Sequence, residues 1–207
     1  MSRILMRPEG NRHPKNVVII VAEGETERIF FNSLKQRNSN IEIKSERGKR
    51  TNARQLVENC LERIQMNELD ISGGDIAICV FDVDNNSQKD LRKAIDVAEK
   101  NGIIVALSNP CFELWYLLHF RDIDHHITSR EIRSDLSKYI TDYDKATDYR
   151  ELLTPHRKEA LVRAKRIAGR RGIKNVIDFM QERNNPCTSI YTAIDAIERL
   201  VKRNQSK

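Results

Sequence analysis

Two aspartates follow a short apolar stretch that is typical of a buried β-strand. Residues Ile76 to Phe81 are all apolar, and Asp82 and Asp84 come directly after them, before two asparagines that favour a turn. Side chains two positions apart in an extended segment point the same way, so these two carboxylates can share one cation. Carboxylate oxygens suit a hard divalent ion such as Mg²⁺. The pair therefore indicates a site at the end of this strand.

A third carboxylate follows an earlier apolar stretch of the same kind. The run from Val17 to Ala22 ends in Glu23 and Gly24. If this strand lies parallel to and beside the 76–81 strand, their carboxyl ends share the edge where open α/β sheets place their sites. We therefore expect Glu23 to lie near Asp82 and Asp84.

Further polar residues near this edge form a second tier of site candidates. The candidates are Glu27, one helical turn after Glu23, Asn109, just after the fourth apolar stretch, and Glu113, in the first turn of the helix that we expect to start at Asn109. Each also has a purely structural interpretation. A glutamate in a first helical turn is favoured by the helix dipole, and an aspartate such as Asp84 often caps the next helix. The sequence leaves these alternatives open.

The order of apolar stretches predicts the fold that positions these acids. Strands are expected at 17–22, 41–44, 76–81 and 103–107, with amphipathic helices between them. This alternation predicts an α/β domain with a mainly parallel sheet, right-handed crossovers and helices on both faces. Thr26 is expected to cap the first helix, and Asn109 with Pro110 to start the helix after the fourth strand.

The chain divides by composition into three parts. Residues 1–15 are polar, basic and interrupted by prolines, and are expected to form a loose arm; residues 16–120 form the α/β core; residues 121–207 have helical spacing and are expected to pack on the core as an extension. The four cysteines lack the spacing of a zinc site or a disulfide framework, which predicts free thiols.

Composition narrows the classes of function. A length of 207 residues with 39% hydrophobic residues allows a real core, and no apolar run approaches the ~20 residues of a membrane span. The first residues also lack the apolar region of a signal peptide, so a cytoplasmic protein without membrane contact is expected. No glycine-rich phosphate loop is present, so the chain itself is not expected to hydrolyse ATP.

Positive charge is concentrated in one segment. The formal net charge is +6, yet residues 157–174 contain eight basic residues and one acidic residue. Arg163, Arg166 and Arg170 recur at three- and four-residue spacing on one face of a helix expected from about Pro155, with Thr154 as its cap. Such a row can follow a phosphate backbone, and we expect it to bind nucleic acid. A solvated helix face or contact with an acidic partner protein are the alternatives.

Four motifs in this order carry a resemblance to a known family. They are Glu23-Gly24-Glu25-Thr26-Glu27, Phe81-Asp82-Val83-Asp84, the segment Ser108 to Trp115 with Leu117 to Phe120, and Asn185-Pro186-Cys187-Thr188. Over about residues 17–190 the chain resembles the RloB family, whose members are Toprim-like proteins encoded in restriction and phage-defence loci, commonly beside an ATPase.

The resemblance implies a fold, a reaction and partners. It implies a Toprim-like Rossmannoid core and a nuclease that uses Mg²⁺ or Mn²⁺, with Asp82 and Asp84 as ligands and Glu23 in a metal or acid–base role. It further implies the effector subunit of an anti-phage system with an ATPase partner, acting on nucleic acid. The sequence leaves both DNA and RNA, with tRNA among them, as candidate substrates. The alternative is a non-catalytic nucleic-acid-binding or assembly subunit of such a system.

Overall fold

A computed structural model describes residues 15–35, 41–48 and 52–205 of the chain. The expected N-terminal arm lies outside these residues, apart from Lys15. Within them, no helix is both long and apolar enough to cross a membrane.

The strands form one mixed sheet. In the described part of the chain the sheet has five strands in the order β2-β1-β3-β4-β5, of which the first four in this order are parallel and β5 is antiparallel to β4. Their bounds are β1 Asn16–Ala22, β2 Ile41–Arg47, β3 Ile76–Asp82, β4 Ile104–Asn109 and β5 Cys187–Thr188. This confirms the predicted α/β class with a mainly parallel sheet. The two-residue strand β5 was not predicted.

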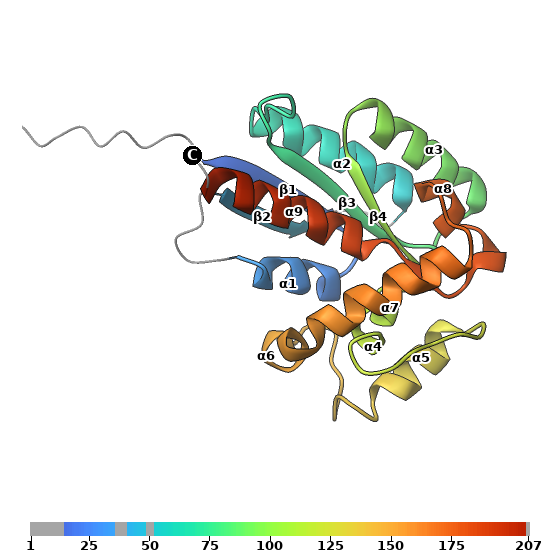
Figure 1. The fold of residues 1–207 in the computed structure, drawn as a ribbon. Helices are drawn as coiled ribbons and strands as arrows, with labels where there is room; N and C mark the ends of the chain where they lie inside the picture. Colours follow the sequence, from blue (N-terminus) through green and yellow to red (C-terminus); the bar gives the residue numbers. More distant parts are fainter. Residues whose placement is uncertain (1–14, 36–40, 49–51, 206–207) are drawn as a thin grey trace, which may run out of the picture.

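Helices cover both faces of the sheet (Figure 1). Helices α2 and α3 pack together on one face and α1 lies on the other, and α9 crosses the sheet against β4, β3 and β2 (Figure 1). The helices are α1 Glu25–Ser33, α2 Ala53–Met66, α3 Gln88–Lys100, α4 Glu113–Leu117, α5 Ser129–Leu136, α6 Arg150–Leu153, α7 Arg157–Arg170, α8 Val176–Phe179 and α9 Ile190–Gln205, with short 3-10 turns at Thr154–His156 and Glu182–Asn184.

The strand order creates a switch point between β1 and β3. From β1 the chain passes through α1 to β2 on one side, whereas from β3 it passes through α3 to β4 on the other side. The crossovers therefore diverge and leave a crevice beyond the carboxyl ends of β1 and β3, which is where open α/β sheets bind ligands. The backbone N–H of Glu23 donates to Val80 O at 3.0 Å and keeps the two strand ends paired up to this crevice.

An aromatic cluster holds α4 against α1 below the crevice. Phe30 from α1 packs edge-on against Phe112 and Trp115, with ring centroids 5.7 and 6.1 Å away. Phe112, Trp115 and Tyr116 are all fully buried. Burial of large aromatic side chains is a major source of stability, so the position of α4 relative to the sheet is well determined.

Three predicted helix starts are wrong. Gly24 is at the N-cap of α1 and Thr26 lies inside the helix. Asn109 is the last residue of β4, and α4 begins only at Glu113 without a side-chain cap, because the strand runs two residues further than its apolar pattern. Thr154 and Pro155 belong to a 3-10 turn, and the basic helix α7 begins at Arg157.

Candidate active site

Glu23 connects the ends of β1 and β3. Its carboxylate accepts a hydrogen bond from the backbone N–H of Asp82 at 3.1 Å and another from Asn85 Nδ2 at 2.9 Å. Burial raises the pKa of Glu23, and these two hydrogen bonds offset part of that rise. Both carboxylate oxygens are thereby held in place, so the position of the Glu23 carboxyl group at the switch point is fixed.

Asp82 is the last residue of β3 and is almost fully buried. Its side chain lines the crevice, and its Oδ1 has no hydrogen-bond partner among the described residues. Burial raises the pKa of Asp82 well above its usual range, and four nearby carboxylates raise it further: Glu27, Glu23, Glu113 and Asp84. A buried carboxyl oxygen without a donor is costly, and the cost falls when a cation or a proton is supplied.

Glu27 turns back over the first turn of α1. A Cβ placed on Gly24 would lie 2.6 Å from Glu27 Oε2, so the glycine provides the room in which this carboxylate lies. The side chain is 5% exposed. Burial raises the pKa of Glu27 to about 7, and the charges of Glu113 and Glu23 contribute to the rise.

Glu113 enters the same crevice from the first turn of α4. Its side chain is 3% exposed, and its Oε1 lies 3.3 Å from the ammonium of Lys145. No described residue donates a hydrogen bond of good geometry to this oxygen. Glu113 therefore adds a fourth buried carboxylate. It reaches the carboxyl edge of the sheet because it is the first residue of α4, which follows the end of β4 after a short connection.

These side chains surround one pocket, which we call the acidic pocket. It has a volume of about 360 Å³. It is lined by Glu23, Gly24, Glu25, Thr26, Glu27, Arg47, Asp82, Asn85, Glu113 and Lys145. Two cations, Arg47 and Lys145, lie at this pocket among the acids, so it can accept both a cation and the phosphate groups of a ligand.

Asp84 and Asn109 occupy different surroundings. Asp84 is exposed and accepts a hydrogen bond from Ser129 Oγ at 2.5 Å, although its charge still acts on Glu23 and Asp82. Asn109 is buried, and its Nδ2 donates to Phe179 O and Gln181 O, both at 3.0 Å. The amide of Asn109 therefore holds the end of α8 rather than the acidic pocket.

The donor set fits a hard divalent cation with an incomplete protein shell. Within residues 15–35, 41–48 and 52–205, no three His, Cys, Asp or Glu side chains are arranged to enclose a metal ion. Mg²⁺ does not require such an enclosure, because it commonly binds one or two carboxylates and keeps several waters. The two oxygens best suited to it are Asp82 Oδ1, which has no hydrogen-bond partner among the described residues, and Glu113 Oε1, whose contact there is the Lys145 ammonium at 3.3 Å.

The three arginines of α7 differ in their contacts. Arg163 Nη1 donates to Leu118 O at 2.8 Å and His119 O at 2.9 Å, so this side chain is engaged at the end of α4. Arg166 forms an ion pair with Asp122 at 2.9 Å, and Arg170 is exposed. Arg166 and Arg170 therefore present the charge that a nucleic acid could meet on this helix.

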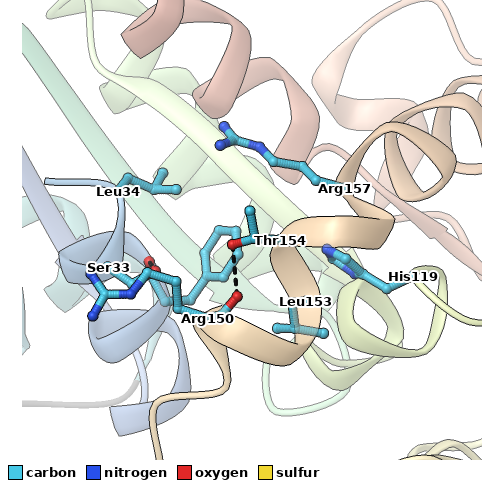
Figure 2. A pocket seen from close by; sticks show the side chains of 8 residues that line it. Ser33, Leu34, His119, Arg150, Leu153, Thr154 and Arg157 are labelled. Atoms are coloured by element: carbon cyan, nitrogen blue, oxygen red, sulfur yellow. Dashed lines mark hydrogen bonds between the residues drawn. The ribbon is translucent and has the colours of Figure 1, made fainter. Parts of the chain in front are cut away.

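A second pocket lies at the other end of α1. Figure 2 shows its lining from α1, α6, the following turn, α7 and His119, around a volume of about 100 Å³. Its hydroxyl groups already donate within the chain: Thr154 Oγ1 to Arg150 O and Ser33 Oγ to Phe30 O. Burial lowers the pKa of His119 to about 4, so its imidazole is neutral. Among the described residues, Arg157 Nε is the one buried side-chain atom of this lining that has no hydrogen-bond partner, whereas the acidic pocket has two such atoms, Asp82 Oδ1 and Glu113 Oε1.

Lys145 and Arg47 were not predicted from the sequence. Arg47 is the last residue of β2, and a strand longer than expected carries it to the edge. Lys145 lies in a polar segment between helices, and only the tertiary path of that segment brings it to Glu113. Neither has a local motif that could have identified it.

Comparison with known proteins supports the resemblance noted in the sequence. The model of the family described as RloB-like protein matches residues 18–197, which is most of the chain. Comparison with curated proteins and with solved structures finds no significant match.

Proposed function

The chain belongs to the RloB-like protein family, and from this membership and its buried carboxylates we propose that it is a metal-dependent nuclease of Toprim type. The observation that carries the proposal is the unpartnered Oδ1 of Asp82, which lies among other carboxylates at the switch point in the described structure. Burial of several like charges is unfavourable without a counter-charge, which a divalent cation supplies.

Asp82 and Glu113 are the residues that would hold the cation directly, with Glu23 and Asp84 completing the set. Glu23 is kept in position by its bonds from Asp82 N and Asn85 Nδ2. Asp84 is the outermost member, because its carboxylate is exposed and bonded to Ser129. Mg²⁺ or Mn²⁺ bound here would neutralise charge on phosphodiester oxygens and supply an activated water.

Glu27 is suited to carry a proton in this reaction. With a pKa of about 7, its carboxyl group is divided between both protonation states at neutral pH. A group of this kind can accept a proton from an attacking water or return one to a leaving oxygen. Its buried position beside Glu113 and Glu23 keeps it within the same pocket.

Nucleic acid is the proposed substrate. Arg47 at the acidic pocket can meet a phosphate that approaches the carboxylates, and Arg166 and Arg170 offer further positive charge on α7. Phosphate contacts from arginine give affinity without sequence readout, so DNA and RNA, including tRNA-like RNA, are both to be tested.

A cleavage assay tests the proposal. Wild type, Asp82→Asn and Asp96→Asn are incubated with duplex DNA, single-stranded DNA and tRNA-like RNA, in Mg²⁺, in Mn²⁺ or in EDTA. Asp96 lies on the exposed side of α3 and serves as the charge-matched control. We expect metal-dependent cleavage by wild type and Asp96→Asn and a loss of at least about a hundredfold in Asp82→Asn. Equal cleavage by Asp82→Asn, or cleavage in EDTA, contradicts the proposed site.

The cellular setting is proposed from the family alone. We place the protein in the cytoplasm as the effector subunit of an anti-phage system with an ATPase partner. In a phage-challenge assay, the Asp82→Asn, Asp84→Asn pair should lose protection while accumulating normally. Retained protection would favour the alternative, a non-catalytic binding or assembly subunit.

A further inference from the structure

Lys145 brings a positive charge into the acidic pocket from the segment 141–149. Its Nζ lies 3.3 Å from Glu113 Oε1, and 63% of its side chain is exposed. Its backbone oxygen accepts a hydrogen bond from Thr26 Oγ1 at 3.1 Å. The main chain is thus attached to the start of α1, whereas the contact of the ammonium group with Glu113 leaves most of the side chain in solvent.

The rest of the segment is anchored independently of the Lys145 ammonium. The rings of Tyr143 and Tyr149 stack with centroids 5.6 Å apart, and both pack edge-on against the buried Tyr116. Tyr149 Oη also accepts a hydrogen bond from the backbone N–H of Asp144 at 2.7 Å. The ammonium can therefore leave Glu113 by side-chain rotation while the segment stays in place.

The acidic pocket needs a counter-charge in the absence of a metal. Asp82, Glu27 and Glu113 are each at least nine-tenths buried and act on one another electrostatically. Arg47 is exposed, and its charge acts on the outer Glu25. A divalent cation at the same carboxylates would repel an ammonium group only a few ångströms away.

We propose that Lys145 is the internal counter-ion of the acidic pocket: its ammonium neutralises Glu113 when no divalent cation is bound and turns to solvent when one binds. The inference rests on the proposed function, because it takes the acidic pocket to be the divalent-cation site. Lys145 thereby lowers the affinity for the cation while it stabilises the metal-free protein.

Calorimetric titration with Mn²⁺ tests the competition directly. The proteins are wild type, Lys145→Gln, Lys145→Arg, which keeps the charge, and Arg47→Gln, which removes a charge from the same pocket without touching Glu113. We expect Lys145→Gln to bind Mn²⁺ roughly three- to tenfold more tightly than wild type. Lys145→Arg and Arg47→Gln should remain within about twofold, because the first retains the ion pair and the second removes a screened charge.

Thermal unfolding supplies a second readout that does not depend on catalysis. In EDTA, Lys145→Gln should unfold about 2–4 °C below wild type, because Glu113 loses its counter-ion. At saturating Mn²⁺ the two proteins should unfold at the same temperature. The two measurements should agree, because the stability that Lys145→Gln loses without metal equals the free energy that it gains in binding Mn²⁺.

The outcomes separate the inference from the proposed function. Equal or weaker Mn²⁺ binding by Lys145→Gln overturns the inference alone, since wild type would still bind the metal. A gain in affinity of the same size in Arg47→Gln also overturns it, because the effect would then be general charge removal. Absence of Mn²⁺ binding in all four proteins contradicts the proposed function and the inference together.

Discussion

Glu27 links the pH of the solution to the stability of the metal-free protein. Its ordinary pKa is 4.5, and burial with neighbouring acids raises it to about 7 in the folded chain. Between these values the unfolded chain releases the proton while the folded chain keeps it, so stability falls as the pH rises. The loss is complete above about pH 7 and absent below about pH 4.5.

Replacement of Glu27 by glutamine should remove this dependence. In EDTA, the difference in unfolding free energy between Glu27→Gln and wild type should grow from pH 5 to 7.5, by up to about 3 kcal/mol. The difference between the two proteins is the quantity to measure, because His119 also makes stability depend on pH. Burial lowers the pKa of His119 to about 4, so its contribution increases stability as the pH rises over part of this range and is the same in both proteins.

Glu25→Gln is the matched control for this measurement. Glu25 lies in the same turn of α1, but its hydrogen bond with Arg28 lowers its pKa, so it titrates below the tested range. Its effect on stability should be constant from pH 5 to 7.5. A constant difference for Glu27→Gln as well would show that Glu27 ionises normally.

The two aspartates of the DVD motif should respond differently to loss of charge. Asp82→Asn removes a buried carboxylate and should leave the metal-free protein equally stable or about 1–2 kcal/mol more stable at pH 7.5. The same variant should lose the rise in unfolding temperature that Mn²⁺ gives wild type. Asp84→Asn changes an exposed group, so it should keep most of that rise. Equal losses in both variants would place Asp84 at the metal as firmly as Asp82.

At the scale of elements, α7 combines a structural arginine with exposed ones. Arg163 donates to two carbonyls at the end of α4, and hydrogen bonds from charged groups to buried acceptors contribute appreciably to stability. Chemical denaturation should show that Arg163→Gln loses about 1–3 kcal/mol. The Arg166→Gln, Arg170→Gln pair should lose less than about 1 kcal/mol, because both positions are exposed.

The same pair tests the nucleic-acid surface without disturbing the fold. Binding is measured against salt concentration for wild type and for the Arg166→Gln, Arg170→Gln variant. Each phosphate contact that is lost should flatten the log–log slope by roughly 0.7 to 0.9. An unchanged slope would indicate that this face of α7 does not contact nucleic acid.

Elements with a strong local signal were predictable, and those without one were not. The four parallel strands follow from apolar runs, and Asn52 and Ser87 cap α2 and α3 through their side chains as such residues usually do. The strand β5 has two residues, too few for any periodicity. It forms because Thr188 Oγ1 and Ser189 Oγ bond to the end of β4, a contact between distant segments.

The candidate site was predictable to the extent that parallel topology determines it. Adjacent strands bring Glu23 and Asp82 together, as their spacing after two apolar runs suggested. The prediction for Asp84 assumed that side chains two positions apart point the same way, which holds only within a strand. Because β3 ends at Asp82, Asp84 turns toward Ser129 instead of joining Asp82 inside the acidic pocket. The contribution of Lys145 depends on how the 141–149 segment crosses the fold, which no local pattern encodes.

At the scale of the whole molecule, divergent crossovers and the packing of α4 close the acidic pocket. Carboxylates reach it from the end of β1, the end of β3, and the first turns of α1 and α4. These elements come from three separate parts of the sequence, residues 16–33, 76–82 and 113–117, and their carboxylates meet in one pocket at the edge of a single sheet. The fold concentrates negative charge at one place, and a bound cation would connect these elements.

Anomalous diffraction from crystals grown with Mn²⁺ tests this account most directly. We predict an anomalous peak in the acidic pocket, about 2.1 Å from Asp82 Oδ1 and within coordination distance of a second carboxylate. We expect this second carboxylate to be that of Glu113. The peak should be absent from crystals of Asp82→Asn grown under the same conditions. A fully occupied Mn²⁺ site elsewhere with none at Asp82, or a peak that persists unchanged in Asp82→Asn, would contradict the assignment of this pocket as the metal centre.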